Sequence, residues 1–459
     1  MAKAPALQQP RGLLRALPDL RLLFVLAWPI VLARAAQAIG GFADALMIAP
    51  LGEAALAAVT TGWLDMYIAS ILPVSTVYIL QSYTAQLRGR GDLASVRRYA
   101  WYGLGIAGAA QLVVLACIPL LPSLLAAAPF EPQVRADLVV YLSIRLLTIG
   151  SLVATEALGS WYGGLGDTRP ALRAGLVTLA ASVLGNSLLI PAHGVAGAAW
   201  ASVIGSLCGL AVIAVPFARS AAPGPARLGL SARELGRVLR LGLPHGISWF
   251  LEVAAFIFFV NVVVAHLGTT ALAAFNVVTQ LNAIAYLPTL GLALAGAIAA
   301  GEAIGRGALP AAVRVAGLAV GAAVVWMVSM AALYLALPAP LVEAFAYSPD
   351  AALGFVAVGV VILRFYALTQ VFDAIGTVLN QVLRAAGDTT WCMLARGLVS
   401  WLVFAPVAWY VVIEADGGVN SAMLVFLAYI AAMALVVAVR FRSSRWQAMD
   451  LVGQDTRVA

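Results

Sequence analysis

Three carboxylic acids interrupt long apolar runs of this sequence, and they are the residues best placed to do chemistry. Asp44, Glu252 and Asp373 each stand among apolar neighbours. An ionisable group at the centre of a membrane helix costs about 2.5–3.5 kcal/mol on insertion scales, so it indicates a function by default. A low dielectric favours the neutral form of a carboxyl group, which can then take up and release a proton. The ionised form binds Na⁺ or attracts an organic cation, so we expect these acids to exchange H⁺ or Na⁺ for a cationic compound.

Two further acids, Asp65 and Glu156, accompany arginines inside the apolar runs. The arginines are Arg34, Arg145 and Arg364. Static ion pairs between helices would account for these residues without any role in transport, since buried charges are normally paired. The alternative is that some of them contact a substrate or a coupling ion. The sequence leaves both interpretations open for Arg34, Asp65 and Glu156.

Polar and aromatic side chains near these acids could line a binding site. Asn276 and Gln280 lie four residues apart, on one face of a helix. Thr369 precedes Asp373 by one helical turn. Aromatic residues in membrane helices more often serve packing, but four of them could form an aromatic lining: Trp63, Tyr67, Tyr286 and Tyr366. The three histidines and three cysteines lack the spacing of a metal site or a catalytic pair, so we expect neither an enzyme nor a cofactor.

The elements that position these residues are membrane helices. Of the 459 residues, 63% are hydrophobic and 10% charged, and the mean hydropathy is +0.98. Soluble domains are about 45–50% apolar and about 25% charged, so this chain cannot cover a surface that faces water. Only helices and closed β-barrels span lipid, and runs such as Leu112–Leu125 and Leu318–Leu337 lack the alternation of barrel strands. The sequence therefore predicts an all-α, polytopic membrane protein.

Breaks at Gly, Pro and charge clusters divide the chain into about twelve spans, each near the roughly 20 residues that cross a bilayer. The expected starts are Leu20, Ala55, Tyr99, Leu138, Ala171, Ala198, Leu241, Thr270, Ala311, Ala352, Thr390 and Ser421. Alternate loops are basic, and they contain Arg88, Arg90, Arg97, Arg98, Arg169, Arg173, Arg306, Arg314, Arg384, Arg396, Arg440, Arg442 and Arg445. The opposite loops contain Arg135 and the acids Glu53, Glu131, Asp137, Glu343, Asp350, Glu414 and Asp416. Basic loops stay cytoplasmic. We therefore expect both termini in the cytoplasm, and we attribute the net charge of +7 to topology rather than nucleic-acid binding.

An internal repeat divides the spans into two sets of six. The segment Leu51–Val59 recurs as Leu267–Phe275, and Gly89-Arg-Gly91 recurs as Gly305-Arg-Gly307, both 216 residues later. Three more matches keep the same order: Pro29 with Pro244, Gly166–Thr168 with Gly387–Thr389, and Gly194-Val195 with Gly418-Val419. An even number of spans per copy predicts a parallel repeat with the substrate between the halves. We expect an N-terminal lobe of residues 1–219, a cytoplasmic linker of residues 220–236 with a capped interfacial helix from Ser231, and a C-terminal lobe of residues 237–459.

The ordered motifs make the chain similar to the multidrug and toxic compound extrusion (MATE) family along nearly its whole length. They are Pro29, Phe42-Ala-Asp44, Ala85-Gln86, Gly89-Arg-Gly-Asp92, Gly164-Leu-Gly-Asp-Thr168, Gly194–Trp200, Leu241-Gly-Leu-Pro244 and Arg384-Ala-Ala-Gly-Asp388. The acids in Phe250-Leu-Glu252 and Asp373-Ala374 resemble those of the NorM-like branch. This resemblance implies that Glu252 and Asp373 form a cation site in the C-terminal lobe, and that Asp44 couples protons or contacts substrate. Asn186 matches the family pattern as well.

Three positions depart from that pattern. Ile190 stands where other branches carry a second acid one turn after Asn186, and Thr369 replaces a tyrosine of the NorM-type Na⁺ site. Arg34 is unusual before Asp44. It either partners an acid or shifts the substrate choice towards anionic or zwitterionic compounds.

The resemblance implies an H⁺ or Na⁺ antiporter of two six-helix lobes that form a V-shaped cleft and rock to alternate access. We expect it as a monomer in the inner membrane, contacting membrane lipid and small amphipathic cations. If the ion is Na⁺, its ligands are expected to be Glu252, Asp373 and Thr369. The expected substrate site comprises Asp44, Arg34, Trp63, Tyr67, Asn186, Asn276, Gln280, Tyr286, Tyr366 and Thr369. The alternatives are a lipid-linked saccharide flippase of the same superfamily and a major facilitator-type transporter.

Overall fold

The protein is helical throughout the residues that the structure, a computed structural model, describes: 17–126, 130–219, 229–345, 349–449 and 451–452. The first half contains α1 (Leu17–Ile48), α2 (Glu53–Val77), α3 (Ile79–Arg90), α4 (Leu93–Cys117), α5 (Leu121–Ala126), α6 (Pro132–Arg145), α7 (Ile149–Gly164) and α8 (Arg169–Arg219). The second contains α9 (Ala232–Phe258), α10 (Thr269–Gly305), α11 (Leu309–Ala336), α12 (Pro338–Glu343), α13 (Pro349–Ala386), α14 (Thr389–Gly397), α15 (Ala405–Trp409) and α16 (Val419–Arg442). Wider π-helical turns continue α9 at Phe259–Val264 and flank α15 at Leu398–Phe404 and Tyr410–Glu414.

Eleven helical segments of the described chain are long and apolar enough to cross a membrane. One of them, α8, has 51 residues, twice what a crossing needs. Its Gly194 has φ 55° and ψ −131°, a conformation that glycine adopts readily, and the helix turns back there. Residues 169–193 and 195–219 are therefore two separate passes of about 37 Å each. The expected all-α fold with twelve spans is confirmed.

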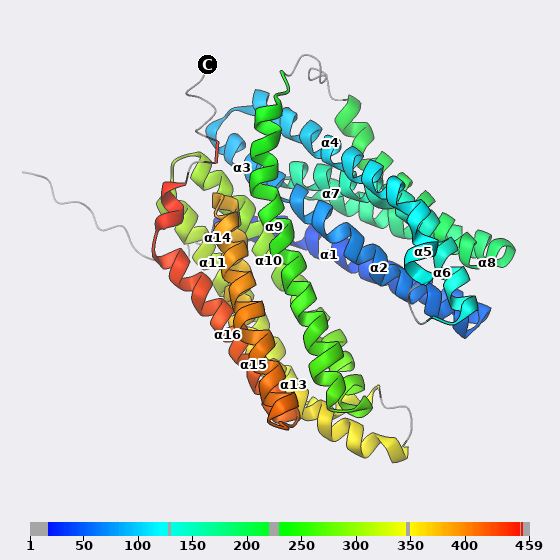
Figure 1. Ribbon diagram of the computed structural model, residues 1–459. Helices are drawn as coiled ribbons and strands as arrows, with labels where there is room; N and C mark the ends of the chain where they lie inside the picture. Colours follow the sequence, from blue (N-terminus) through cyan, green and yellow to red (C-terminus); the bar gives the residue numbers. More distant parts are fainter. Residues whose placement is uncertain (1–16, 127–129, 220–228, 346–348, 450, 453–459) are drawn as a thin grey trace, which may run out of the picture.

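The two halves meet at one end and diverge from there, with α1–α8 on one side and α9–α16 on the other (Figure 1). The contacts between them involve few helices: α2 packs on α9, α3 on α10, and α1 on α10. The end where they meet carries the basic residues, because α3 ends at Arg90, α10 at Gly305 next to Arg306, and α9 begins beside Arg233. We call this end of the molecule the basic end.

A pair of repeat-related glycines forms a seam between the halves at the basic end. A Cβ atom on Gly89 would collide with the backbone carbonyl oxygen of Glu302, and one on Gly305 would collide with that of Gln86. Each residue pair becomes the other when both positions shift by the 216-residue repeat. The contact therefore has approximate two-fold symmetry, like that of a symmetric dimer interface. Glycine is needed at both positions because only its backbone approaches so closely.

Polar contacts reinforce the seam. The side-chain amide of Gln86 donates to the carbonyl oxygen of Ala385 over 2.8 Å, and the hydroxyl of Ser82 donates to that of Arg384 over 3.4 Å. Arg88 forms an ion pair with Glu302 at 3.6 Å. The ends of α3, α10 and α13 are thus tied together across the two halves.

The first helix of each half begins against the other half. Leu23 and Leu26 of α1 are buried in the hydrophobic core of the second half, and Asp19 pairs with Arg314 of α11 at 3.0 Å. In return, Glu234 near the start of α9 accepts a hydrogen bond from Tyr102 of α4 over 2.5 Å and pairs with Arg98. This exchange closes the basic end.

The predicted cap at Ser231 is confirmed, because its hydroxyl oxygen accepts a hydrogen bond from the backbone N–H of Arg233. The prediction of a separate interfacial helix is wrong. The cap opens α9 itself, which continues without a break into the membrane span. Most of the predicted linker, residues 220–228, lies outside the described residues.

The seam leads to a prediction about lobe separation. Replacing Gly89 with Ala should hold the halves apart at the basic end, because the added methyl group meets backbone atoms that cannot rotate away. Spin labels on cysteines at the exposed positions Leu93 and Arg306, with Cys117, Cys208 and Cys392 replaced, should report a longer distance by electron–electron resonance. Gly105→Ala in α4 is the matched control, since a Cβ there meets nothing within 4 Å. An unchanged distance in the Gly89→Ala variant would contradict the steric role of the seam.

Candidate functional site

In the first half, Asp44 of α1 faces Asn186 of α8. The amide nitrogen of Asn186, which is fully buried, donates to a carboxylate oxygen of Asp44 over 2.5 Å. Arg145 of α6 interacts electrostatically with the same carboxylate. The amide oxygen of Asn186 has no hydrogen-bond partner. An amide can present either its N–H or its oxygen after a flip, so Asn186 can serve both the ionised and the protonated form of Asp44. The structure brings together these two predicted residues.

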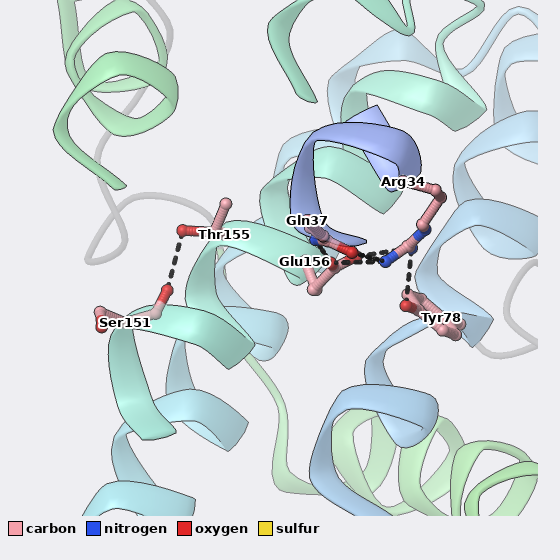
Figure 2. A network of polar contacts seen from close by, with 6 residues as sticks. All are labelled: Arg34, Gln37, Tyr78, Ser151, Thr155 and Glu156. Carbon is pink, nitrogen blue, oxygen red and sulfur yellow. Dashed lines mark hydrogen bonds and ion pairs between the residues drawn. The ribbon is translucent and has the colours of Figure 1, made fainter. Parts of the chain in front are cut away.

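Arg34 and Glu156 form an ion pair between α1 and α7 (Figure 2). One guanidinium nitrogen donates to Glu156 Oε1 over 3.0 Å and the other to Glu156 Oε2 over 3.1 Å, a two-pronged geometry. The hydroxyl of Tyr78 and the side-chain oxygen of Gln37 accept further hydrogen bonds from Arg34 over 2.7 and 2.9 Å. The static ion pair considered for Glu156 is therefore present. Asp65, in contrast, forms no ion pair or hydrogen bond within the described chain, so that interpretation is wrong for Asp65.

In the second half, Glu252 of α9 forms an ion pair with Arg396 of α14. Arg396 was expected in a basic loop, but its side chain is 14% exposed and turns inward to the acid. Arg384 was expected there as well. It is 2% exposed, and one of its guanidinium nitrogens lies 2.6 Å from the imidazole Nε2 of His245, on α9. The loop assignment failed for both because an arginine near the end of a span is long enough to reach back into the protein.

Asp373 of α13 makes no ion pair among the described residues. Its carboxylate accepts a hydrogen bond from the hydroxyl of Thr377 over 3.2 Å and interacts electrostatically with Glu252 and Arg396. The hydroxyl groups of Tyr286 and Tyr366 are near enough to sense its charge. Glu252 and Asp373 thus share one environment, as the resemblance implied, and Asp373 is the acid of the two without a paired arginine.

Aromatic residues connect the charged groups of the two halves. The ring of Tyr67 stacks on that of Trp63 with centroids 5.8 Å apart, and its hydroxyl hydrogen-bonds the indole of Trp249 on α9. The charge on Tyr67 is coupled to both Arg34 and Glu252. Tyr286 interacts in the same way with Tyr67 and Glu252. Three of the predicted aromatic residues therefore lie between the two sets of charges, and Tyr366 is buried beside Asp373.

Other predicted positions contribute less. Asn276 and Gln280 are exposed and contact none of the acids, and Thr369 is buried with its hydroxyl donating to the backbone oxygen of Tyr366. No group of three or more His, Cys, Asp or Glu side chains suited to a metal occurs in the described part of the chain. Sequence reasoning missed Gln37, Tyr78, Trp249 and Arg396. The repeat could have identified Gln37, because Glu252 follows it by the same 215 residues that separate Pro29 from Pro244.

A family model matches this combination of two six-helix halves and membrane-depth acids. The MatE model covers residues 29–188 and 244–410, one segment in each half. The chain belongs to the MatE family. Both matched segments include the charged residues described above, from Arg34 to Glu156 in the first and from Glu252 to Arg396 in the second.

Curated relatives place the chain near the NorM-like members of the MatE family. It is 30% identical over 396 residues to the probable multidrug resistance protein NorM of Deinococcus radiodurans, which covers 84% of this chain and 86% of that protein. It is 27% identical to the NorM of Pseudomonas putida, over 87% of this chain and 89% of the relative. The multidrug resistance protein PmpM of Pseudomonas aeruginosa is 28% identical, over 88% of this chain and 86% of PmpM.

Solved structures agree on the fold. A multidrug resistance MATE family transporter in an outward-facing conformation superimposes with a TM-score of 0.86 at 18% identity, over 94% of this chain and 97% of the other. A transporter of the same superfamily from Pyrococcus furiosus, described as having a binding pocket of reversed polarity, gives 0.85 at 19%, with the same coverage. The MatE fold, a multi-pass membrane protein of a transporter family, is thus established for this chain.

The contact between Asp44 and Asn186 makes a prediction about stability. Asn186→Leu should destabilise the protein by about 1–3 kcal/mol, because it leaves the Asp44 carboxylate without its donor. The double variant Asp44→Leu with Asn186→Leu should recover part of that loss, since it leaves no polar group unpaired. Thermal unfolding in detergent, followed by tryptophan fluorescence, measures both. Ser187→Ala is the control next in sequence, as Ser187 is exposed. Equal melting temperatures for Asn186→Leu and the unmodified protein would show that the bond is unimportant.

Proposed function

We propose that this chain is an antiporter of the inner membrane that exports small amphipathic cations in exchange for H⁺ or Na⁺. The observation that carries the proposal is the set of acids at membrane depth, above all Asp373, which has no ion-pair partner among the described residues. An acid in such a place is costly unless a cation or proton visits it. The multidrug resistance named for NorM and PmpM supports a substrate range of this kind.

The orientation follows from the basic end. Arginine-rich ends of spans face the cytoplasm, so the seam between α3 and α10 closes the cytoplasmic side and both termini lie in the cytoplasm. The helices diverge towards the opposite side (Figure 1). This arrangement corresponds to a state open to the outside, and transport requires a second state in which the seam separates. The proposal therefore includes alternation between the two by movement of the halves.

Exchange requires that the coupling ion and the substrate compete for the same charge. Glu252 and Asp373 sense each other's charge, so protonation or Na⁺ binding at Asp373 changes the field at Glu252 and its arginine. A cationic substrate near Tyr67 and Tyr286 would meet aromatic faces, which attract cations, together with these acids. Loading the site with H⁺ or Na⁺ removes the attraction and releases the substrate.

A lipid-linked saccharide flippase is less well supported. Such a protein needs unpaired basic groups for an anionic headgroup. Here Arg34 and Arg396, the arginines closest to the aromatic residues, are each paired with an acid. The charges available to a ligand are therefore acidic, which favours cationic compounds.

Amide substitution tests the proposal. Asp373→Asn should reduce cation-driven ethidium efflux from everted vesicles to the level of vesicles without the protein, because the amide neither ionises nor binds a cation. Glu252→Gln should reduce it as well and also leaves Arg396 unpaired. Asp137→Asn, at the opposite membrane face, is the matched control and should be as active as the unmodified protein.

Purified protein in liposomes identifies the ion. A pH gradient and a Na⁺ gradient are imposed separately, and the gradient that drives uptake names the partner. If neither gradient drives transport, or if Asp373→Asn transports at the normal rate, antiport through this acid is wrong.

A further inference from the structure

The internal repeat relates the ion pair of the first half to the acid pair of the second. Glu252 follows Gln37 by 215 residues, and Trp249 follows Arg34 by the same number. The repeat offset lies between 216 and 221 in the region around Glu156, which maps this acid onto the turn from Phe372 to Thr377, the turn that contains Asp373. The two acidic positions of the second half therefore correspond to Gln37 and Glu156 of the first.

The structure shows that these counterparts also touch. The side-chain nitrogen of Gln37 donates to Glu156 Oε1 over 3.2 Å, while Glu252 and Asp373 interact through their charges. Both pairs link the first and fourth spans of their half, α1 with α7 and α9 with α13. The two arrangements are thus related in space as well as in sequence.

Arg34 is the difference between them. Its guanidinium group is held by Glu156, Gln37 and Tyr78, and the Tyr78 hydroxyl also bonds to Glu156 (Figure 2). Four hydrogen bonds, two from each terminal nitrogen, use four of the five N–H donors of an arginine. A carboxylate, an amide oxygen and a hydroxyl around one positive charge form the ligand set of a cation site.

We propose that Arg34 is a built-in cation that permanently occupies a cation site in the first half, the counterpart of the site at Glu252 and Asp373. In the second half the acid of the fourth span, Asp373, has no such partner, because Arg396 pairs with Glu252 instead. Binding of a mobile cation is consequently confined to the second half. The link to coupling rests on the proposed function, whereas the occupied site in the first half does not.

The closed network argues against Arg34 as a docking group for anionic substrates. A substrate carboxylate would have to displace Glu156, whose two oxygens are both bonded to Arg34, together with Tyr78. The side chains of Arg34 and Glu156 are only 23% and 14% exposed. A built-in cation explains this saturation, while a substrate contact would require free donors.

Chemical rescue tests the proposal with ethylguanidinium as the probe. Arg34→Ala removes the tethered cation and leaves Glu156, Gln37 and Tyr78 around the vacated position. Ethylguanidinium should then raise the melting temperature of the purified variant saturably, by roughly 2–3 °C at saturation. The unmodified protein, whose site is occupied, should show no such increase. The double variant Arg34→Ala with Glu156→Gln should show none either, because the site has lost its charge.

Two further variants separate the possible outcomes. Arg34→Lys keeps a positive charge beside Glu156 and should fold without the probe and not respond to it; Arg364→Ala removes an exposed arginine from a span and should not respond. If Arg34→Ala folds only when ethylguanidinium is present, the proposal is supported as well. A folded Arg34→Ala that shows no shift, or a shift that persists without Glu156, overturns it. None of these measurements depends on transport, so they can fail while Asp373→Asn still abolishes efflux, and the reverse.

Discussion

The cost of placing charge in an apolar environment governs the interior of this protein. A carboxylate away from water is tolerated only when another group compensates it, by pairing, by hydrogen bonding or by a visiting ion. The acids divide along this line. Glu156 and Glu252 are held by arginines. Asp44 receives a hydrogen bond from a buried amide and the field of an arginine, and Asp373 receives little more than one hydroxyl. The uncompensated acid is where an ion has most to contribute.

The same repeat that distributes these charges also builds the contact between the halves. Gly89 and Gly305 occupy equivalent positions, and each accepts the backbone of the other half at the place where a side chain would not fit. α1 and α9 are exchanged in the same way, each beginning in the territory of the opposite half. A duplicated six-helix unit can form such an interface with one set of solutions used twice. This economy explains why the short motifs recur in order while the rest of the two copies has diverged.

Much of the fold follows from the sequence because it depends on composition and on strong local signals. Length of apolar runs, Gly194 between two passes of α8, and the sorting of arginines all act locally. The pairing of charges does not. Nothing near Arg396 or Arg34 in the sequence says which acid, on a distant helix, each will meet. Arginines near span ends were assigned to loops because periodicity gives their depth but not the direction of a long side chain. Gln37 and Tyr78 were missed since neutral polar residues carry no signal until their partner is known.

The charged groups and the contact between the halves are mechanically connected through Tyr78. This residue occupies the break between α2 and α3, immediately before the helix that forms the seam. Its hydroxyl holds Arg34, while its ring lies 6.2 Å from that of Trp249 and 6.4 Å from that of His245, both on α9. Just before it, α2 carries Leu72 and Thr76, whose carbonyl oxygens face Gly246 and Gly242 of α9 so closely that a Cβ atom would not fit. Separating the halves at the basic end must move α9 past Tyr78, and Glu252 lies further along that same helix. Movement of the halves therefore shifts Glu252 and its arginine relative to the fixed ion pair of the first half, so the field around Asp373 differs between the closed and the separated seam.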